Sequence, residues 1–430
     1  MAPPSAPPAV EDLLAFLDAS PTPYHAAREA ARRLEAAGSA AVDRGRPWST
    51  VAPRGHLVAG GAVVAWALPP DGPAAPRLRL VGAHTDSPGL RLKPRPDTGR
   101  AGWRQLAVEV YGGALVNSWL DRDLGLAGRV AVSGPGGVEE HLLRVDEPVL
   151  RVPQLAIHLD REVTSQGLRL DRQHHLAPVW DVGDVDPGGF RRWLGGRLDV
   201  APDAIGGWDL MAHDVSPARR VGRDGALVSS GRLDDLCCCW AAVSALAATE
   251  PAAGDPGAVV VLFDHEEVGS GSTHGASGPL LAEVLERLVL ARGGDRHDLL
   301  AALPSAALAS ADMAHATHPG YADRHEPGHP IAIDGGPVVK VNAGQRYATE
   351  PATQAAFEVA CATAGVPVQH FVGHNEIPCG STIGPLAAAA VGIPTVDVGV
   401  AQLAMHSARE LCGAEDPPRM AAALAVWLQG

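Results

Sequence analysis

Apolar and polar positions in the second half of the chain form two alternating patterns. Short apolar runs such as "GAVVVLFDH" (257–265) and "PTVDVGV" (394–400) are typical of buried strands, whereas "PLLAEVLERLVLAR" (279–292) and "PATQAAFEVACATAG" (351–365) are typical of helices. Strands that alternate with helices form βαβ units, in which helices cover both faces of a sheet. The pattern therefore predicts an α/β fold with a mixed, mostly parallel sheet flanked by helices.

The first part of the chain has a helical pattern followed by two strand-like runs. Residues 20–38 have Thr22 placed to cap a helix, a proline in the first turn and a glycine at the end, which predicts an exposed helix. The runs "HLVAGGAVVAWALP" (56–69) and "RLRLVGAHTDSP" (77–88) are separated by turn-forming residues. This spacing predicts a hairpin or a sheet edge.

A different pattern occupies residues 95–220. Short β-like runs such as "QLAVEVYG" and "LAGRVAVSG" are separated by glycine and proline, without long amphipathic helices between them. We therefore expect a β-rich insert within the α/β domain. The length of 430 residues agrees with one large domain that carries a second module, because single cores rarely grow so large.

Composition and charge limit the class of protein. A formal charge of −14 argues against nucleic acid and against an anionic membrane surface as partners. Six cysteines without CxxC spacing indicate a reduced cytoplasmic location. The start of the chain has no basic region followed by an apolar stretch, and no run of about 18 apolar residues occurs. We expect a soluble cytoplasmic protein with a disordered arm at residues 1–8.

Acidic residues and histidines gather where strand-like runs end. In open α/β sheets the carboxyl ends of strands meet at one crevice, so side chains from separate strands come together there. One histidine with several carboxylates is what a two-metal site needs, with ligands about 2.0–2.2 Å from each zinc and one carboxylate bridging both ions. The candidates are His84, Asp86, Asp234, Asp235, Glu266, Glu267, Asp312 and His406.

The adjacent pair Glu266 and Glu267 predicts two different roles. At a strand end the turn can bring both side chains to the rim, with one binding metal and the other facing the water that the metal activates. Glu267 would then be the ligand and Glu266 the general base. The alternative is two solvated acids on a loop.

Several motifs together resemble the aspartyl aminopeptidase family of dinuclear zinc metallopeptidases. The resemblance runs in order from about residue 10 to residue 428. The motifs are "GAHTDSPGLRLKP", "YGGALVNSWLDRDLGLAGRV", "VPQLAIHLDRE", "GRLDDL", "DHEEVGSGS", "SADMAHATHPGY", "GPVVKVNAGQRYAT" and "QLAMHSARE". The resemblance implies a discontinuous catalytic domain, residues 1–94 and 221–430, interrupted by a β-rich dimerisation domain at residues 95–220.

The resemblance also implies the metal ligands. His84 would bind one zinc, Asp234 would bridge both ions, and Asp312 would complete the first set. Glu267 and His406 would hold the second zinc, and Glu266 matches the general base.

Three further residues have roles that the resemblance implies, and a fourth, His315, is a candidate because of its position in the sequence. Asp86 would be the carboxylate that orients a ligating histidine. His158 lies in the insert and would cross into a neighbouring subunit to stabilise the oxyanion; a packed insert histidine is the alternative. Lys340 would pair with an acidic substrate side chain, unless it is a surface strand lysine. His315, three residues after Asp312, would face the substrate.

We therefore expect a zinc aminopeptidase that removes N-terminal Asp or Glu from peptides. One alternative is a dinuclear hydrolase of other specificity or an amino-acid deacylase, and another is a metal-stabilised assembly protein without activity. A histidine donated across a two-fold axis implies a homo-oligomer built from dimers, and the resemblance implies a dodecamer.

Two motifs have no role in this hypothesis. "GGALVNSWLDRD" supports either the site or an interface, and the histidines of "HATHPGYADRHEPGHP" form either an extra metal tract or, as is more common for irregularly spaced histidines, a solvated loop.

Overall fold

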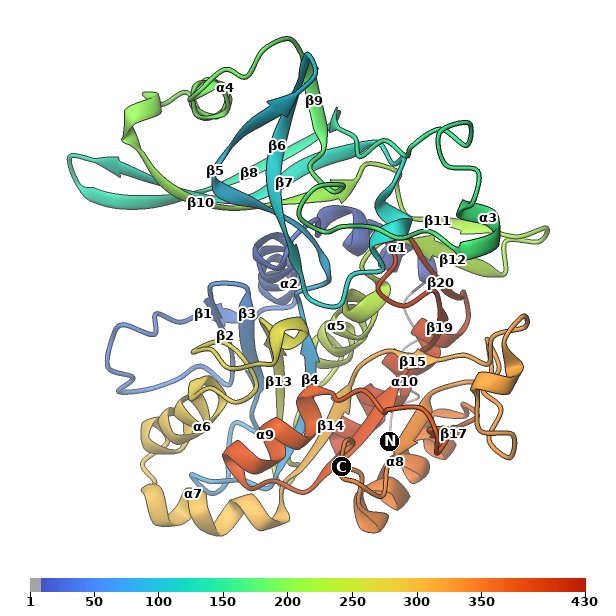
Figure 1. Ribbon diagram of the computed structural model, residues 1–430. Helices are drawn as coiled ribbons and strands as arrows, with labels where there is room; N and C mark the ends of the chain where they lie inside the picture. Colours follow the sequence, from blue (N-terminus) through green and yellow to red (C-terminus); the bar gives the residue numbers. More distant parts are fainter. Residues whose placement is uncertain (1–8) are drawn as a thin grey trace.

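The computed structural model describes residues 9–430, so the arm expected at residues 1–8 lies outside the described residues. Figure 1 shows two layers, a lower one built on a large sheet between helices and an upper one built on a second sheet. The lower sheet has nine strands, in the spatial order β1 (Ala40–Ala41), β2 (Arg54–Ala59), β3 (Ala62–Ala67), β13 (Gly257–Phe263), β4 (Leu78–His84), β14 (Ala307–Ala311), β18 (Thr395–Gly399), β16 (Val338–Val341) and β17 (Gln369–Val372).

The centre of the lower sheet is parallel. Strands β13, β4, β14 and β18 run in one direction, whereas β3 is antiparallel to β13 and β16 is antiparallel to β18. Strands β4 and β13 are almost wholly buried, as expected of parallel strands covered on both faces. The predicted fold class, a mixed and mostly parallel sheet flanked by helices, is confirmed.

Helices cover both faces of this sheet, because alternate residues of each strand point in opposite directions. In β3, Val63 and Ala65 pack in one core, and Val64 and Trp66 pack in the other. The first core contains α1 (Val10–Ala19), α2 (Pro23–Ala36), α5 (Leu233–Ala247), α8 (Pro351–Ala364) and α10 (Asp416–Gln429). The second contains α6 (Leu280–Ala291), α7 (Arg296–Ala302) and α9 (Ile383–Val391).

The upper layer is an antiparallel six-stranded sheet with a core of its own. Its strands, in spatial order, are β8 (Gly137–Leu150), β7 (Leu124–Gly134), β10 (Ile205–Asp214), β5 (Gly89–Arg100), β6 (Trp103–Tyr111) and β9 (Val179–Val182). The layer also carries α3 (Val163–Gln166) and α4 (Gly189–Leu198). The boundary expected at residue 95 falls inside β5.

A small five-stranded sheet lies beside these layers in Figure 1. Its order is β11 (Arg219–Val221), β12 (Leu227–Ser230), β20 (Glu410–Gly413), β19 (Ala401–Leu403) and β15 (Ala314–His315). In the part of the chain that the structure describes, no helix combines the length and apolar character needed to span a bilayer.

Tyr24 of α2 joins the lower layer to the upper one. Its hydroxyl donates to Asp209 of β10, and the guanidinium of Arg129 in β7 lies 4.2 Å from its ring centroid. Asp209 also forms an ion pair of 2.8 Å with Arg91 of β5. A half-buried cation over an aromatic ring and a shared carboxylate therefore connect three strands of the upper sheet to one helix of the lower layer.

The predictions for the first part of the chain were wrong in two respects. Helix α2 is not an exposed helix, because Ala26, Ala30 and Leu34 bury one face, and its N-cap Thr22 makes no capping bond but contacts Nδ1 of His25 at 2.8 Å. The hairpin lies within the first strand-like run, as β2 and β3 joined at Gly60, and β13 separates β3 from β4.

Candidate active site

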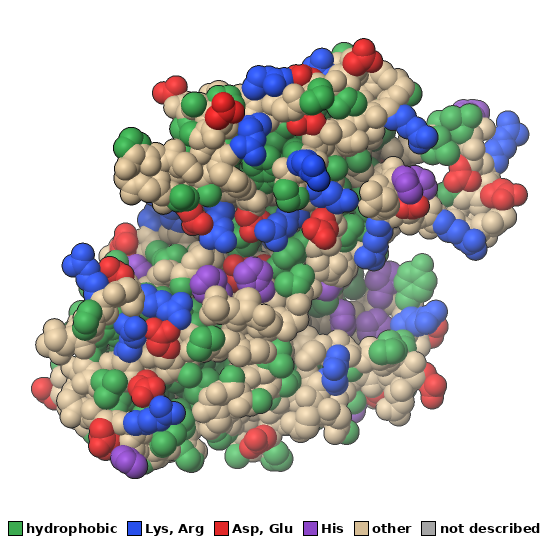
Figure 2. Space-filling view, turned by 60° about the vertical axis from the view of Figure 1, so that its left-hand side comes forward, with side chains coloured by type: hydrophobic (Ala, Val, Ile, Leu, Met, Phe, Trp, Pro, Cys, Tyr) green, Lys and Arg blue, Asp and Glu red, His purple; other side chains and the backbone are tan. Residues whose placement is uncertain are grey.

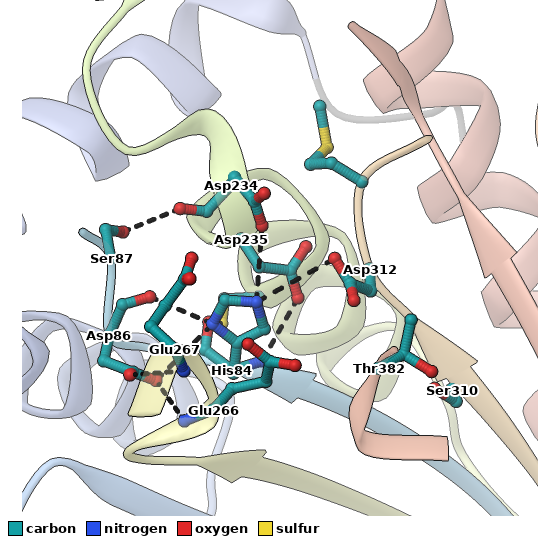
Figure 3. Close-up of polar contacts among 12 residues, drawn as sticks. His84, Asp86, Ser87, Asp234, Asp235, Glu266, Glu267, Ser310, Asp312 and Thr382 are labelled. Carbon is teal, nitrogen blue, oxygen red and sulfur yellow. Dashed lines mark hydrogen bonds and ion pairs between the residues drawn. The ribbon is translucent and has the colours of Figure 1, made fainter. Parts of the chain in front are cut away.

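The candidate residues come from loops and strand ends at one edge of the lower sheet (Figure 3). His84 is the last residue of β4, Glu267 follows β13, and Asp312 follows β14, and these three strands are neighbours that run in parallel. Asp234 opens α5 with non-helical backbone angles, and His406 lies between β19 and β20. The carboxyl ends of the parallel strands therefore bring together side chains that are far apart in the sequence.

His84 is buried and faces two carboxylates. Its Nε2 lies 3.3 Å from Oδ1 of Asp234 and 3.8 Å from Oδ1 of Asp312. Its Nδ1 lies 2.9 Å from the carbonyl oxygen of Asp86, and since a carbonyl can only accept, Nδ1 carries the proton and Nε2 is left for the cluster. Burial lowers the pKa of His84, but the carboxylates of Asp234 and Asp312 outweigh burial and raise the pKa well above its usual value.

His406 faces the same cluster from the other side. Its Nε2 lies 3.6 Å from Oδ2 of Asp234 and 3.4 Å from Oε1 of Glu267. Asp234 thus has one oxygen toward each histidine, which is the arrangement of a bridging carboxylate. The structure brings His84, Asp234, Glu267, Asp312 and His406 together in one cluster.

The donor set fits metal ions. Three buried oxygens, Oδ1 of Asp234, Oδ1 of Asp235 and Oε1 of Glu267, have no hydrogen-bond partner among residues 9–430. Ligand atoms of His84, Asp234 and Glu267 lie within 4.8 Å of one another, as do those of His84, Asp235 and Asp312. Buried carboxylates without partners are costly, and divalent cations would offset that cost. Imidazole and carboxylate donors are ligands that zinc accepts.

Asp86 holds the turn that carries both glutamates. The backbone N–H of Glu266 donates to its Oδ1 at 3.0 Å, and the N–H of Glu267 donates to its Oδ2 at 3.1 Å. Its Oδ1 also lies 3.5 Å from Nδ1 of His84. Burial raises the pKa of Asp86, but its contacts with His84 and Tyr111 outweigh burial and lower the pKa, so the carboxylate stays charged.

Glu266 lies beside His84 in Figure 3. Burial raises the pKa of Glu266 to about 7, with the charge of His84 opposing this shift and the carboxylates of Asp312 and Asp234 adding to it. A carboxylate with a pKa near neutrality can both take up and release a proton, which is what a general base that later acts as an acid requires.

Residues 16–426 match the family described as aminopeptidase I zinc metalloprotease (M18). A probable M18 family aminopeptidase 2 of Streptomyces coelicolor is 52% identical over 422 residues, covering 97% of this chain and 97% of that protein, and the protein of that name from Mycobacterium tuberculosis H37Rv is 50% identical with the same coverage.

This chain belongs to the M18 family. The predicted resemblance is confirmed, since M18 is the aspartyl aminopeptidase family. Among solved structures, Ape4 in complex with Nbr1 has a TM-score of 0.91 at 33% identity, covering 98% of this chain and 85% of that one. The mApe1 dodecamer of S. cerevisiae has a TM-score of 0.83 at 26% identity, covering 97% and 95%. The chain is thus an M18 zinc metallo-aminopeptidase.

Two predicted substrate residues of this M18 chain lie near the cluster. Lys340 is buried in β16, and its ammonium donates to the carbonyl oxygens of Asp312 and Met313 at 3.2 and 3.1 Å and lies 3.8 Å from Oδ2 of Asp312. Lys340 is therefore not a surface lysine. His315 is exposed on β15, with its ring 6.2 Å from that of Phe371.

His158 is exposed on the upper layer of the M18 chain. The segment that carries it projects from that layer at the right of Figure 1. Its neighbours Leu155, Ile157 and Leu159 are also exposed, and Leu159 has 75% of its surface accessible. No recorded contact joins His158 to the cluster within the described part of this chain.

Two further residues support this M18 site: Asp235, which the sequence named as a candidate without a role, and Glu410, which sequence reasoning missed. Asp235, adjacent to the predicted bridge, is fully buried and accepts the backbone N–H of His84 at 3.1 Å. Glu410 accepts the N–H of Asp234 at 3.1 Å and that of His406 at 2.7 Å, and burial raises its pKa to about 8 with the charge of Asp234 adding to the shift. The only sequence signal for Glu410 was its place in "QLAMHSARE".

Proposed function

We propose that this chain is an aspartyl aminopeptidase that removes N-terminal Asp or Glu from peptides with two zinc ions. The observation that carries the proposal is the single cluster of two histidines and three carboxylates around Asp234. His84, Asp234 and Asp312 would hold one zinc, and Asp234, Glu267 and His406 would hold the other. The chemistry that zinc supplies when bound is Lewis acidity, which polarises a carbonyl and lowers the pKa of water toward about 7.

Glu266 would move the proton. Its carboxylate takes a proton from the attacking water and returns it to the departing amine. Its position next to the ligand Glu267, on a turn held by Asp86, keeps the base within the cluster without making it a ligand. Asp86 orients the turn and the ring of His84 together.

The test of the function is a Glu266→Gln variant. The amide preserves the shape of the side chain but cannot take up a proton, so zinc content should match the wild type while kcat on an Asp-peptide falls at least about 100-fold. Zinc is measured by mass spectrometry of the dialysed protein, and turnover by amine release. Undiminished turnover by this variant would exclude Glu266 as the base.

Lys340 supports specificity for acidic residues. Burial lowers the pKa of Lys340, but Asp312 and Asp397 outweigh burial and raise it, so the ammonium stays charged. An ammonium has three protons, and two are given to backbone carbonyls, which leaves one for a substrate carboxylate. Together with His315 on β15, it would select acidic side chains.

The contacts of Lys340 also favour one alternative, an M18 aminopeptidase that prefers other residues, because two of its protons are already occupied. Turnover on Asp-, Glu- and Leu-peptides by the wild type and by Lys340→Ala separates the two functions. We expect acidic substrates to be preferred and that preference to fall at least about 10-fold in the variant. A wild type that prefers the Leu-peptide would establish the alternative.

The upper layer is proposed as a dimerisation domain in a cytoplasmic homo-oligomer built from dimers. Residues 155, 157 and 159 expose large apolar side chains in one short segment, which is typical of an interface. His158 in this segment would reach the active site of a neighbouring subunit. The related mApe1 of S. cerevisiae is a dodecamer, and we propose the same assembly here. Light scattering that shows an active monomer would contradict this assembly.

A further inference from the structure

One segment of the upper layer reaches into the candidate active site. Residues 111–118, here called the 111–118 segment, begin with the last residue of β6 and include the first part of η1 (Val116–Trp119). Residues 112–118 belong to the motif "GGALVNSWLDRD", which the proposed mechanism does not use. The segment contacts two of the three proposed ligands of the second zinc, Glu267 and His406, and the residue that holds the glutamate turn, Asp86.

Gly113 orients the ring of His406. The carbonyl oxygen of Gly113 lies 3.2 Å from Nδ1 of His406, and since a carbonyl only accepts, Nδ1 carries the proton. Nε2 is thereby left to face Asp234 and Glu267. Two more bonds hold the same loop, from the N–H of Leu115 to the carbonyl of His406 at 2.9 Å and from the N–H of Ala408 to Oγ of Ser118 at 2.8 Å.

Gly112 brings the backbone against Glu267. Its φ is +65°, in the left-handed region that favours glycine. A Cβ at this position would lie 3.0 Å from Cβ of Glu267 and 3.2 Å from its carbonyl oxygen. Only glycine combines this backbone angle with this close approach.

Tyr111 completes the contact at Asp86. Its hydroxyl donates to Oδ2 of Asp86 at 2.8 Å, the oxygen that also accepts the N–H of Glu267. Tyr111 is the last residue of β6, paired with Gly89 in β5, so its position is set by the upper sheet.

The two histidines of the cluster are thus oriented from different layers. The ring of His84 is held by the carbonyl of Asp86, two residues further along the chain, whereas the ring of His406 is held by Gly113 of the upper layer. We propose that the 111–118 segment is a positioning element for Glu267 and His406, so that the second zinc depends on the upper layer directly. The segment reaches the first zinc only through the bond of Tyr111 to Asp86, which lies beside His84, so the first zinc depends on the upper layer less. This inference rests on the proposed two-zinc function.

The test compares zinc affinity in wild type, Gly113→Ala and Tyr111→Phe. In Gly113→Ala the new Cβ would lie 3.1 Å from Nδ1 of His406 and displace the ring, and Tyr111→Phe removes one hydroxyl at constant shape. Gly207→Ala is the matched control, since Gly207 lies in β10 of the same layer and a Cβ there meets nothing within 4 Å. Equilibrium dialysis across a range of free zinc gives the stoichiometry and both dissociation constants.

We expect two zinc ions in the wild type and in Gly207→Ala. In Gly113→Ala one zinc should bind as in the wild type and the other about 10- to 100-fold more weakly, with a smaller change of the same kind in Tyr111→Phe. Titration with Co²⁺, whose visible absorption reports its ligands, should lose its second step in Gly113→Ala. Unchanged affinities in both variants, or equal weakening of both ions, would overturn the inference alone. A wild type that binds one zinc would overturn the two-zinc function as well.

Discussion

At the scale of single residues, the carboxylate of Asp86 is the most connected group of the site that is not a proposed ligand. Its two oxygens each accept a backbone N–H of the glutamate turn, and Tyr111 adds a third bond. An asparagine at this position offers one acceptor oxygen and places an N–H₂ group against the second N–H. The position of the turn, and with it the proposed base Glu266 and the proposed ligand Glu267, therefore depends on a carboxylate here.

We expect Asp86→Asn to lower kcat on an acidic peptide about 10- to 100-fold, as is usual for groups that orient metal ligands, with a small change in KM. Steady-state kinetics measures this effect. Asp97→Asn is the control, because Asp97 likewise accepts two backbone N–H groups, from Gly188 and Phe190, but within the upper layer. Equal loss of kcat in both variants would show that the effect of Asp86 is on stability alone.

The five proposed ligands and the orienting carboxylate Asp86 could be predicted from the sequence, but other residues that hold the ligands, such as Glu410 and Tyr111, could not. His84, Glu267 and Asp312 follow apolar runs, so their place at a strand end is a local property of the chain. Glu410 and Tyr111 act by bonding to groups 176 and 25 residues away in the sequence, and the partners of such bonds depend on the packing of whole elements. Their residue types are common in many other roles, so no local pattern distinguishes them.

At the scale of elements, α7 has a capping box that the other helices around the lower sheet mostly lack. Asp295 accepts the N–H groups of His297 and Asp298 at 2.7 and 3.0 Å, and the side chain of Asp298 accepts the N–H of Asp295 at 2.9 Å. These bonds satisfy donors that a helix N-terminus otherwise leaves to water.

We expect Asp295→Ala to lower the free energy of unfolding by about 1 kcal/mol without a change in kcat. The free energy of unfolding is measured by urea denaturation, with circular dichroism as the signal. Glu415→Ala is the matched control, since Glu415 is the N-cap residue of α10 but its side chain makes no capping bond. A loss of the same size in the control would mean that the capping bonds do not account for the effect.

Element types were predictable from periodicity, but their neighbours in the sheet were not. The run at 257–265 forms β13 as expected, yet its place between β3 and β4 separates strands that are adjacent in the sequence. The local pattern of apolar and polar residues predicts which side chains of a strand point toward the core. It does not predict the order of the strands in the sheet. The buried face of α2 was missed for a similar reason, because its alanines carry little hydrophobic signal by themselves.

At the scale of the whole molecule, stability should depend on pH through histidines buried between the layers. His213 of β10 is 4% exposed, and its Nε2 lies 3.2 Å from the carbonyl oxygen of Val145. Burial lowers the pKa of His213 from 6.5 to about 4, with the charge of Arg232 adding to this shift. The folded protein therefore keeps this imidazole neutral in a pH range where the unfolded chain binds a proton.

Because the unfolded state binds more protons between pH 6.5 and 4, stability is complete above pH 6.5 and is lost as the pH falls toward 4. At about 1.4 kcal/mol per pH unit over the shift from 6.5 to about 4, this one group accounts for at most about 3.5 kcal/mol. Thermal unfolding at several pH values should show Tm falling less steeply in His213→Gln than in the wild type. If Tm falls equally steeply with pH in the variant and in the wild type, other groups cause the loss of stability in acid. His25 is one such group, because burial lowers its pKa to about 4.

The change of pattern at residues 95–220 predicted a separate β-rich unit, and the six-stranded sheet of the upper layer is built from residues 89–214. The sequence did not predict that this unit also positions Glu267 and His406 of the site. Gly113 acts on His406 through its backbone carbonyl. Every residue type has a backbone carbonyl, so the amino-acid composition of the segment could not predict this contact with His406.

The position of β4 between β13 and β14 has a consequence for synthesis on the ribosome. β4 leaves the exit tunnel early, but its partners at residues 257–263 and 307–311 follow only after the whole upper sheet has emerged. The strands of the antiparallel sheet pair over shorter distances along the chain, so this sheet can fold first. The apolar strand β4 meanwhile remains unpaired and exposed. Nascent chains stopped before residue 257 should therefore bind chaperones at residues 78–84.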